Sequence, residues 1–223
     1  MKIFIGNLTF LLMMTIFSGC IAFRTYTPSI NPAAIPRDSS SLSVGAGLPI
    51  FLEYRTQINS HLDLLVNGAY TPNSVVFAVG PNLWFWPKNS KPGFNCSVFF
   101  EPNISVNADA SLNWSTYGGR LGFTPGYYGA HWNFSFPISA GGGGALNGTG
   151  GYFDGSGGIQ IQYVWVRNSF GLDIGVAFGS GMSSWGHTLI LLFPIPTLSL
   201  IYTHAFGNET KQNTEPVDKR IWR

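Results

Sequence analysis

Three charged residues near the start of the predicted fold form the clearest candidate site. Glu53 and Arg55 are two residues apart within SLSVGAGLPIFLEYRTQI, residues 41–58, and Asp63 follows after a short turn. Side chains two apart on a strand share a face, and an antiparallel hairpin brings its two arms together. We therefore expect Glu53, Arg55 and Asp63 to form a charged cluster, which would serve as an interior salt bridge or as part of a substrate or ion path.

Metal-binding and catalytic patterns are weak elsewhere in the chain. The histidines show no HxxxH, HExxH or Cys/His spacing, so the sequence predicts no metal site. Ser183 and Ser184 near His187, or His204 with Glu209, offer Ser and His in the same region, but they match no hydrolase or acyltransferase motif. We therefore predict no enzyme activity, with a lipid-acting enzyme as an alternative. The four histidines are His61, His131, His187 and His204.

The segment GGGGALNGTGGYFDGSGG, residues 141–158, resembles a ligand-binding loop only in its glycine content. It contains no phosphate-binding spacing of the GxGxxG or GK[ST] type in a strand–helix context. Asp154 is the one carboxylate within it, and one carboxylate is too few to hold calcium. We predict a flexible loop between strands, facing outside or binding partners, and no cofactor.

Composition limits the class of protein. Charged residues make up 10% of the 223 residues, whereas ordinary soluble domains carry roughly 25%. Aromatic residues reach 15%, which argues against disorder. The formal net charge is +2 and no basic tract is present, so nucleic acid is not an expected partner.

The N-terminus, MKIFIGNLTFLLMMTIFSGC, has the order of a secretory signal: a lysine, an apolar run and then small residues. Residues 1–19 are therefore predicted to be a signal peptide. Asn7 and Thr9 interrupt the apolar stretch, which is too short for a spanning helix of about 20 residues.

Phe17–Ser18–Gly19–Cys20 resembles the lipobox of bacterial lipoproteins, although Phe17 replaces the commoner leucine. The resemblance implies that Cys20 is acylated with fatty acids such as palmitate and becomes the new N-terminus. Ile21 then resembles the signal for sorting to the outer membrane. An ordinary secretory signal is the alternative. Cys96 is then left without a disulfide partner, and we expect it to be a structural thiol.

Period-2 segments between turn residues extend over residues 41–206, and none shows a helical period. They predict an all-β fold, an antiparallel up-and-down β-barrel of eight to ten strands. Residues 20–40 are predicted to be a lipidated N-terminus and linker, and residues 207–223 a polar tail. In the first hairpin, a three-residue loop, residues 59–61, would place Ile58 opposite Leu62.

The polar face of these segments has too few charges for the outside of a soluble barrel. We therefore expect the apolar face to point to lipid and the charges to lie inside, with aromatic girdles at the interfaces. Prolines 49, 81, 102 and 137 count against this arrangement unless they mark bulges or bends. The expected interior charges are Glu53, Arg55, Asp63, Glu101, Arg120 and Asp173. The expected girdle residues are Tyr70, Trp84–Phe85–Trp86, Trp114, Tyr127–Tyr128 and Tyr163–Trp165.

Taken together, the lipobox-like signal and the Gly/aromatic alternation resemble a small outer-membrane β-barrel protein of a Gram-negative-type bacterium. The resemblance implies membrane lipid as a partner and a structural or surface-interaction role, with an unidentified surface or periplasmic protein partner. A small pore or transporter, and a soluble, lipid-anchored periplasmic barrel that binds an apolar ligand, are the alternatives.

Overall fold

The computed structural model describes residues 40–48, 50–71, 74–87, 93–107, 115–129, 131–146, 151–165, 167–182 and 188–206. Residues 1–39 and 207–223, which hold the expected signal peptide, Cys20, the linker and the tail, lie outside the described residues. All regular structure in the described part is β-strand. The strands are β1 (Ser40–Leu48), β2 (Ile50–Asn59), β3 (Leu62–Thr71), β4 (Ser74–Trp84), β5 (Gly93–Asn107), β6 (Thr116–Tyr128), β7 (Trp132–Ser135), β8 (Ile138–Ala145), β9 (Gly151–Trp165), β10 (Asn168–Met182) and β11 (Thr188–Phe206).

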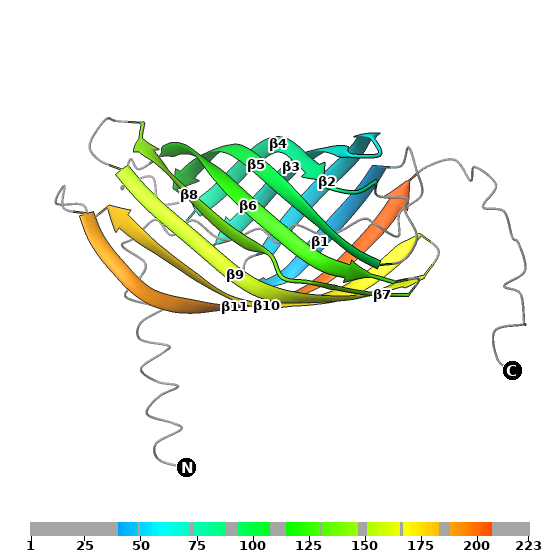
Figure 1. Ribbon diagram of the computed structural model, residues 1–223. Coiled ribbons are helices and arrows are strands. Elements are labelled where there is room, and N and C mark those ends of the chain that lie inside the picture. The colour runs from blue at the N-terminus through cyan, green and yellow to red at the C-terminus, as the bar shows by residue number, and fades with distance from the viewer. Residues whose placement is uncertain are drawn as a thin grey trace, which may run out of the picture.

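The strands form one closed antiparallel sheet (Figure 1). From β1 to β6 each strand pairs with the next, and β11 pairs with both β1 and β10. The short strands β7 and β8 occupy one position between β6 and β9, and β9 pairs with β10 to close the ring. The result is a ten-strand up-and-down barrel, which confirms the predicted fold class. Within the described residues no helix is long and apolar enough to cross a membrane, a finding that does not bear on crossing by strands.

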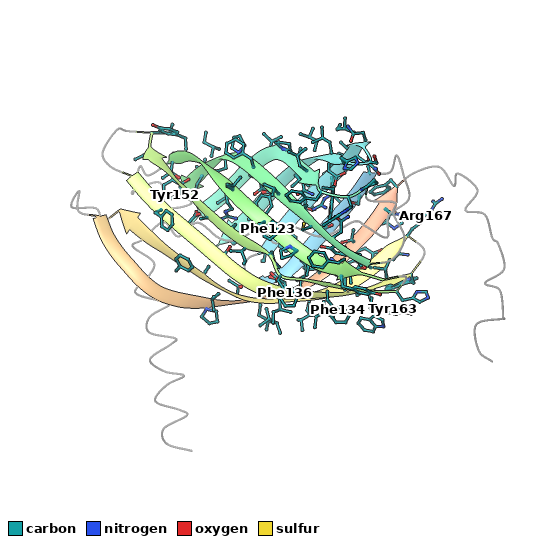
Figure 2. All side chains as sticks on the ribbon, in the orientation of Figure 1. Phe123, Phe134, Phe136, Tyr152, Tyr163 and Arg167 are labelled. Atoms are coloured by element: carbon teal, nitrogen blue, oxygen red, sulfur yellow. The ribbon has the colours of Figure 1, made fainter. Side chains whose placement is uncertain are left out.

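The two faces of each strand differ sharply. In β2, burial alternates residue by residue over most of the strand, with Phe51, Glu53 and Arg55 buried and Ile50, Leu52 and Tyr54 exposed. The same alternation in the other strands places polar side chains in the lumen and large apolar ones outside. Figure 2 shows Phe134, Phe136 and Tyr163 projecting away from the barrel. The apolar face therefore points outward, as the sequence predicted.

Prolines interrupt pairing without opening the sheet. In the ladder between β4 and β5, residues 79–81 of β4 do not pair with residues 100–102 of β5. Pro81 and Pro102 lie in these two facing stretches. Pro137 separates β7 from β8, and its carbonyl still accepts a hydrogen bond from Gly158 N at 3.0 Å. These positions fit proline, which has no ladder donor to give. Pro49 lies outside the described residues.

The first hairpin differs from the predicted one at its tip. Leu52, Tyr54 and Thr56 pair as expected with Gly68, Val66 and Leu64. Ile58, however, is the extra residue of an irregularity between Gln57 and Asn59, and Asn59 pairs with Leu62. The turn is therefore two residues long, and the bulge absorbs the change of register that a two-residue turn would otherwise impose on both faces.

The glycine-rich segment was wrongly predicted to be a flexible loop. Residues 141–145 belong to β8 and residues 151–158 to β9, and the two strands pair from Ile138 with Gly157 to Gly144 with Gly151. Glycine is needed here because neighbouring chains approach closely. A Cβ on Gly143 would lie 1.9 Å from the Tyr117 carbonyl oxygen of β6.

Two residues expected in the girdles point inward instead. Trp84 and Tyr128 are each 4% exposed, and their rings meet edge to face at 6.0 Å between centroids. Their neighbours Phe85, Trp86 and Tyr127 are exposed, as expected of girdle residues. Both residues are at positions of their strands where every second side chain faces the lumen. This alternation outweighs the general preference of Trp and Tyr for an interface. Tyr70 and Tyr163 are also exposed and Trp165 is half-buried, whereas Trp114 lies outside the described residues.

Aromatic rings in the lumen lie over glycines of the adjacent strand. Gly122 of β6 pairs with Phe99 of β5, and a Cβ on Gly122 would lie 2.1 Å from the Phe99 ring. Phe99 is 1% exposed, so the ring has little room to move. Gly45 and Phe51 repeat this arrangement between β1 and β2.

We expect Gly122→Ala to destabilise the barrel by about 1–3 kcal/mol, since it overpacks a filled lumen. Gly68→Ala is the control, because a Cβ on Gly68 would meet its nearest atom at an ordinary 3.7 Å. Urea unfolding of the protein refolded in detergent micelles measures both. Equal effects of the two changes would contradict the packing of Phe99 on Gly122.

Candidate functional site

The expected charged cluster lies inside the barrel. Glu53 and Arg55 are on the lumen face of β2, and Asp63 is on β3, directly opposite Gln57 and diagonal to Arg55. Glu53 and Arg55 are each 2% exposed and Asp63 is 0% exposed. The alternation of β2 and the register of the hairpin together bring these three side chains to one place.

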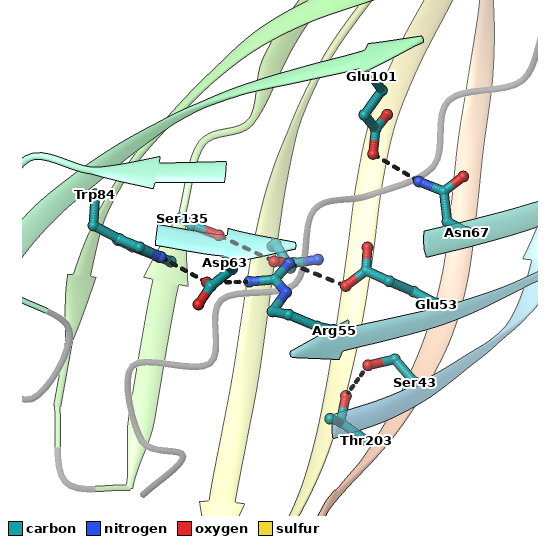
Figure 3. A network of polar contacts seen from close by, with 10 residues as sticks. Ser43, Glu53, Arg55, Asp63, Asn67, Trp84, Glu101, Ser135 and Thr203 are labelled. Atoms are coloured by element: carbon teal, nitrogen blue, oxygen red, sulfur yellow. Dashed lines mark hydrogen bonds and ion pairs between the residues drawn. The ribbon is translucent and has the colours of Figure 1, made fainter. Parts of the chain in front are cut away.

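Arg55 joins the two carboxylates. Its Nη2 lies 3.0 Å from Glu53 Oε1, and its Nη1 lies 3.9 Å from Asp63 Oδ2 (Figure 3). Trp84 of β4 donates a hydrogen bond from Nε1 to the same Asp63 oxygen at 2.8 Å. Asp63 thus receives a charged group from one side and an indole donor from the other, which fits the requirement that a buried charge be paired and hydrogen-bonded.

A second group of charges continues this arrangement on β5, β6 and β9. Glu101 accepts a hydrogen bond from Asn67 Nδ2 at 2.6 Å, and it is opposite Arg120 in the β5–β6 register. Arg120 Nη2 in turn lies 3.7 Å from Asp154 Oδ2. We call the two groups together the lumen charge cluster. Its members are Glu53, Arg55, Asp63, Glu101, Arg120 and Asp154.

Sequence reasoning missed the part that Asp154 plays in this cluster. Asp154 is 4% exposed, and a Cβ on Gly141 would lie 2.7 Å from its Oδ1, so the carboxylate lies over that glycine. Asp154, Ser156, Gly158 and Gln160 recur at every second position and so share one face of a strand. This period-2 pattern was the signal that could have placed Asp154 in the lumen. Its glycine-rich neighbours suggested a loop and concealed the alternation.

The lumen around the cluster is filled by side chains. Phe51, Phe99, Trp84 and Tyr128 project inward and are 1–4% exposed. Side chains filling the interior are expected for a barrel of about this size. The cluster is thus suited to linking strands β2, β3, β5, β6 and β9 through ion pairs and hydrogen bonds, and is not suited to binding a large substrate.

The other candidate residues do not come together into a site. His61 and His131 are at turns, where each ring Nδ1 lies within hydrogen-bond distance of a backbone carbonyl. His204 Nδ1 lies 2.8 Å from Asn168 Oδ1. Among the described residues, no group of three or more His, Cys, Asp and Glu side chains could hold a metal ion. Ser183, Ser184, His187 and Glu209 lie outside the described residues.

Cys96 is a free and buried thiol. It is 7% exposed, although it is on the same, outward face of β5 as Phe94. Its backbone is fixed within the β4–β5 pair, since Phe85 N donates to Cys96 O at 3.0 Å.

The fold and its lumen define the class of protein: a closed, ten-strand antiparallel β-barrel with a polar, charged interior. No protein-family model matches the chain, and no curated protein matches it. Among solved structures, it is similar to the outer-membrane expressed OmpT of Vibrio cholerae, with a TM-score of 0.35 and 9% sequence identity over 85% of this chain and 74% of that chain. This similarity is too low for any property of that protein to be carried over.

Replacing Arg55 with methionine should be strongly destabilising. The change leaves Glu53 and Asp63 buried without their shared cation, and breaking a buried ion pair in this way costs about 3–5 kcal/mol. The matched control is the triple variant Arg55→Met, Glu53→Gln, Asp63→Asn, which removes all three charges and should recover much of the loss. Urea unfolding followed by tryptophan fluorescence would test this. A single variant as stable as the wild type would show that the cluster contributes little.

Proposed function

We propose that this chain is an integral outer-membrane β-barrel protein of a Gram-negative-type bacterium, with a structural or surface-interaction role. The observation that carries the proposal is the outer face of the barrel. Every Asp and Glu that the structure describes is buried, together with Arg55 and Arg120, and Arg167 is half-buried. In the described part of the chain, the half-buried Arg167, which precedes β10, is therefore the one Asp, Glu, Lys or Arg that is not buried, while large apolar side chains are exposed on strands around the ring.

Such a surface fits lipid and is unsuited to water. Contiguous exposed apolar patches on soluble monomers rarely exceed a few hundred Å², and a soluble barrel normally has charges on its outer face. In a membrane barrel the pattern reverses, with apolar residues outside and polar residues inside. Closure of the sheet also pairs its backbone groups, which strands crossing a bilayer require.

A structural or surface-interaction role is favoured over transport because the lumen is filled. Buried aromatic rings and the lumen charge cluster occupy the space that a solute would need. A small pore is therefore the weaker proposal. We also propose no catalytic activity, since no described Ser, His and carboxylate group forms a nucleophile–base arrangement.

Lipid anchoring through Cys20 is a second part of the proposal. It rests on the sequence Phe17–Ser18–Gly19–Cys20 after the apolar run and on the position of Cys20, some twenty residues before β1. The anchor and the barrel would attach the chain to the membrane independently.

Arginine on the outer face should be tolerated near a strand end and poorly tolerated near the middle of a strand. Leu121, near the centre of β6, and Ile58, beside the β2–β3 turn, are 58% and 57% exposed. In lipid, Leu121→Arg should cost about 2–4 kcal/mol and Ile58→Arg about 0–1 kcal/mol. Unfolding in urea from phospholipid bilayers measures the difference. If water surrounds the barrel, both substitutions should be tolerated equally.

Cell fractionation separates the integral barrel from a soluble barrel held only by a lipid. We expect the Cys20→Ala form to stay in the membrane fraction after an alkaline wash, because the barrel itself remains inserted. The wild type, washed in parallel, shows the retention when both attachments are present. Release of the Cys20→Ala form would favour the soluble, lipid-anchored alternative.

A further inference from the structure

Asp173 of β10 is a buried carboxylate outside the lumen charge cluster. It is 1% exposed. Among the described residues, no Lys, Arg or His forms an ion pair with it, whereas Glu53 and Asp154 have Arg55 and Arg120. Burial of a carboxylate without a positive charge is strongly unfavourable. Asp173 therefore requires another source of positive charge or a proton.

The register surrounds Asp173 with uncharged polar side chains. It is directly opposite Gln160 of β9 and Ser199 of β11, which are 1% and 2% exposed. Directly opposite residues of an antiparallel pair have Cβ atoms about 4.5–5.5 Å apart. Gln160 is oriented from its far side by Ser135, whose hydroxyl donates to Gln160 Oε1 at 3.2 Å.

Glycines on both sides of Asp173 along β10 leave space that two further polar side chains enter. A Cβ on Gly175 would lie 3.0 Å from Thr197 Oγ1, and a Cβ on Gly171 would lie 2.9 Å from Gln162 Cγ. Thr197 and Gln162 therefore flank Asp173 in the lumen. We call this group the Asp173 site. Its members are Asp173, Gln160, Gln162, Thr197 and Ser199.

Several atoms of the Asp173 site have unmet hydrogen-bonding capacity. Within the described residues, two oxygens that can ligate a cation, Asp173 Oδ1 and Thr197 Oγ1, have no hydrogen-bond partner. The amide nitrogens of Gln160 and Gln162 have none either; they are donors, so they are not ligands of a cation. Thr197 is 5% exposed and Gln162 is 2% exposed. Buried polar atoms in proteins almost always have a partner. Both the charge and the hydroxyl thus indicate a small polar ligand at this position.

We propose that the Asp173 site binds one alkali cation, Na⁺ or K⁺, inside the lumen. One carboxylate offers a single negative charge, which a monovalent cation neutralises. Carboxylate and hydroxyl oxygens are the hard ligands that such cations prefer. Divalent ions are usually held by more carboxylates than one, and no further carboxylate faces Asp173 from β9 or β11 in the described residues.

The inference does not depend on where the protein resides. The site is defined by the register of β9, β10 and β11 and by the lumen side of a closed sheet. A barrel in water would hold the same group of side chains. Failure of the membrane proposal and failure of the cation proposal are therefore separate results.

Ion binding is tested with the full-length protein refolded in zwitterionic detergent micelles. Sodium and potassium chloride are compared with N-methylglucamine chloride at equal ionic strength, because N-methylglucamine is too large for the site. We expect a higher urea midpoint in one or both alkali salts, since a ligand that binds only the folded state stabilises it. Saturable sodium NMR relaxation, or its displacement by potassium, reports the binding itself and which ion is preferred.

Matched variants connect the effect to the site. Asp173→Asn, which is nearly isosteric, should lower the affinity at least about tenfold, because loss of metal-supporting groups commonly costs 10–100-fold. Thr197→Val should cause a smaller loss. Asp154→Asn removes the same charge from the neighbouring strand, where Arg120 already pairs with it at 3.7 Å, and should leave ion binding nearly unchanged.

Two results would overturn the proposal. One is a wild type without saturable sodium or potassium binding and without a salt-specific midpoint, which would indicate that Asp173 is protonated or hydrated. The other is an equal loss in Asp154→Asn and Asp173→Asn, which would show that only the total lumen charge matters. If Asp173→Asn does not refold, the wild-type titration still decides the first outcome. A loss in Asp154→Asn as large as that in Thr197→Val would then overturn the assignment to the Asp173 site.

Discussion

The structure depends on the constraint that its few charges lie inside the sheet. A strand has two faces, and in the described strands the outer one is largely apolar. Each Asp, Glu and Arg side chain of these strands is therefore in the lumen, where water cannot fully solvate it. Arg55 between Glu53 and Asp63, and Arg120 beside Asp154, meet this constraint by pairing. The Arg55 pairs lie within β2 and across to the adjacent strand β3, whereas the Arg120–Asp154 pair connects β6 with β9, which are separated in the sheet by β7 and β8. The second pair can therefore also help to fix the shape of the barrel.

The lumen is divided between two kinds of lining. The buried aromatic side chains and both buried arginines come from β2–β6, whereas β7–β11 and β1 contribute mainly Ser, Thr, Gln, Asn and Gly on the lumen side. Large side chains on one wall require small ones around them, and the glycines beneath Phe51 and Phe99 are local examples. This division explains why the chain has so many glycines in strands, where glycine is otherwise unfavourable.

The alternation of apolar and polar side chains along each strand was sufficient to predict most of this arrangement. It predicted the barrel, the outward apolar face and the interior position of Glu53, Arg55 and Asp63, because period-2 alternation is a local property of the sequence. The sequence did not reveal the interior positions of Trp84 and Tyr128, since their rings suit an interface as well as a filled lumen. It also failed at residues 141–158, where glycine reflects close approach between strands and not a loop, a fact that only the tertiary contacts of Gly143 show.

The same lumen thus contains two electrostatic solutions, and their difference follows from its lining. Near β2–β6 there is room for long side chains, so guanidinium groups neutralise carboxylates within the protein. Beside Asp173 the neighbouring positions of β10 are Gly171 and Gly175, and its opposite residues are Gln160 and Ser199, none of which can supply a positive charge. The carboxylate of Asp173 stays ionised there only if a small cation that is not part of the protein binds beside it. The glycines beside Asp173 supply no side chain of their own, and they let Gln162 and Thr197 approach the carboxylate from both sides.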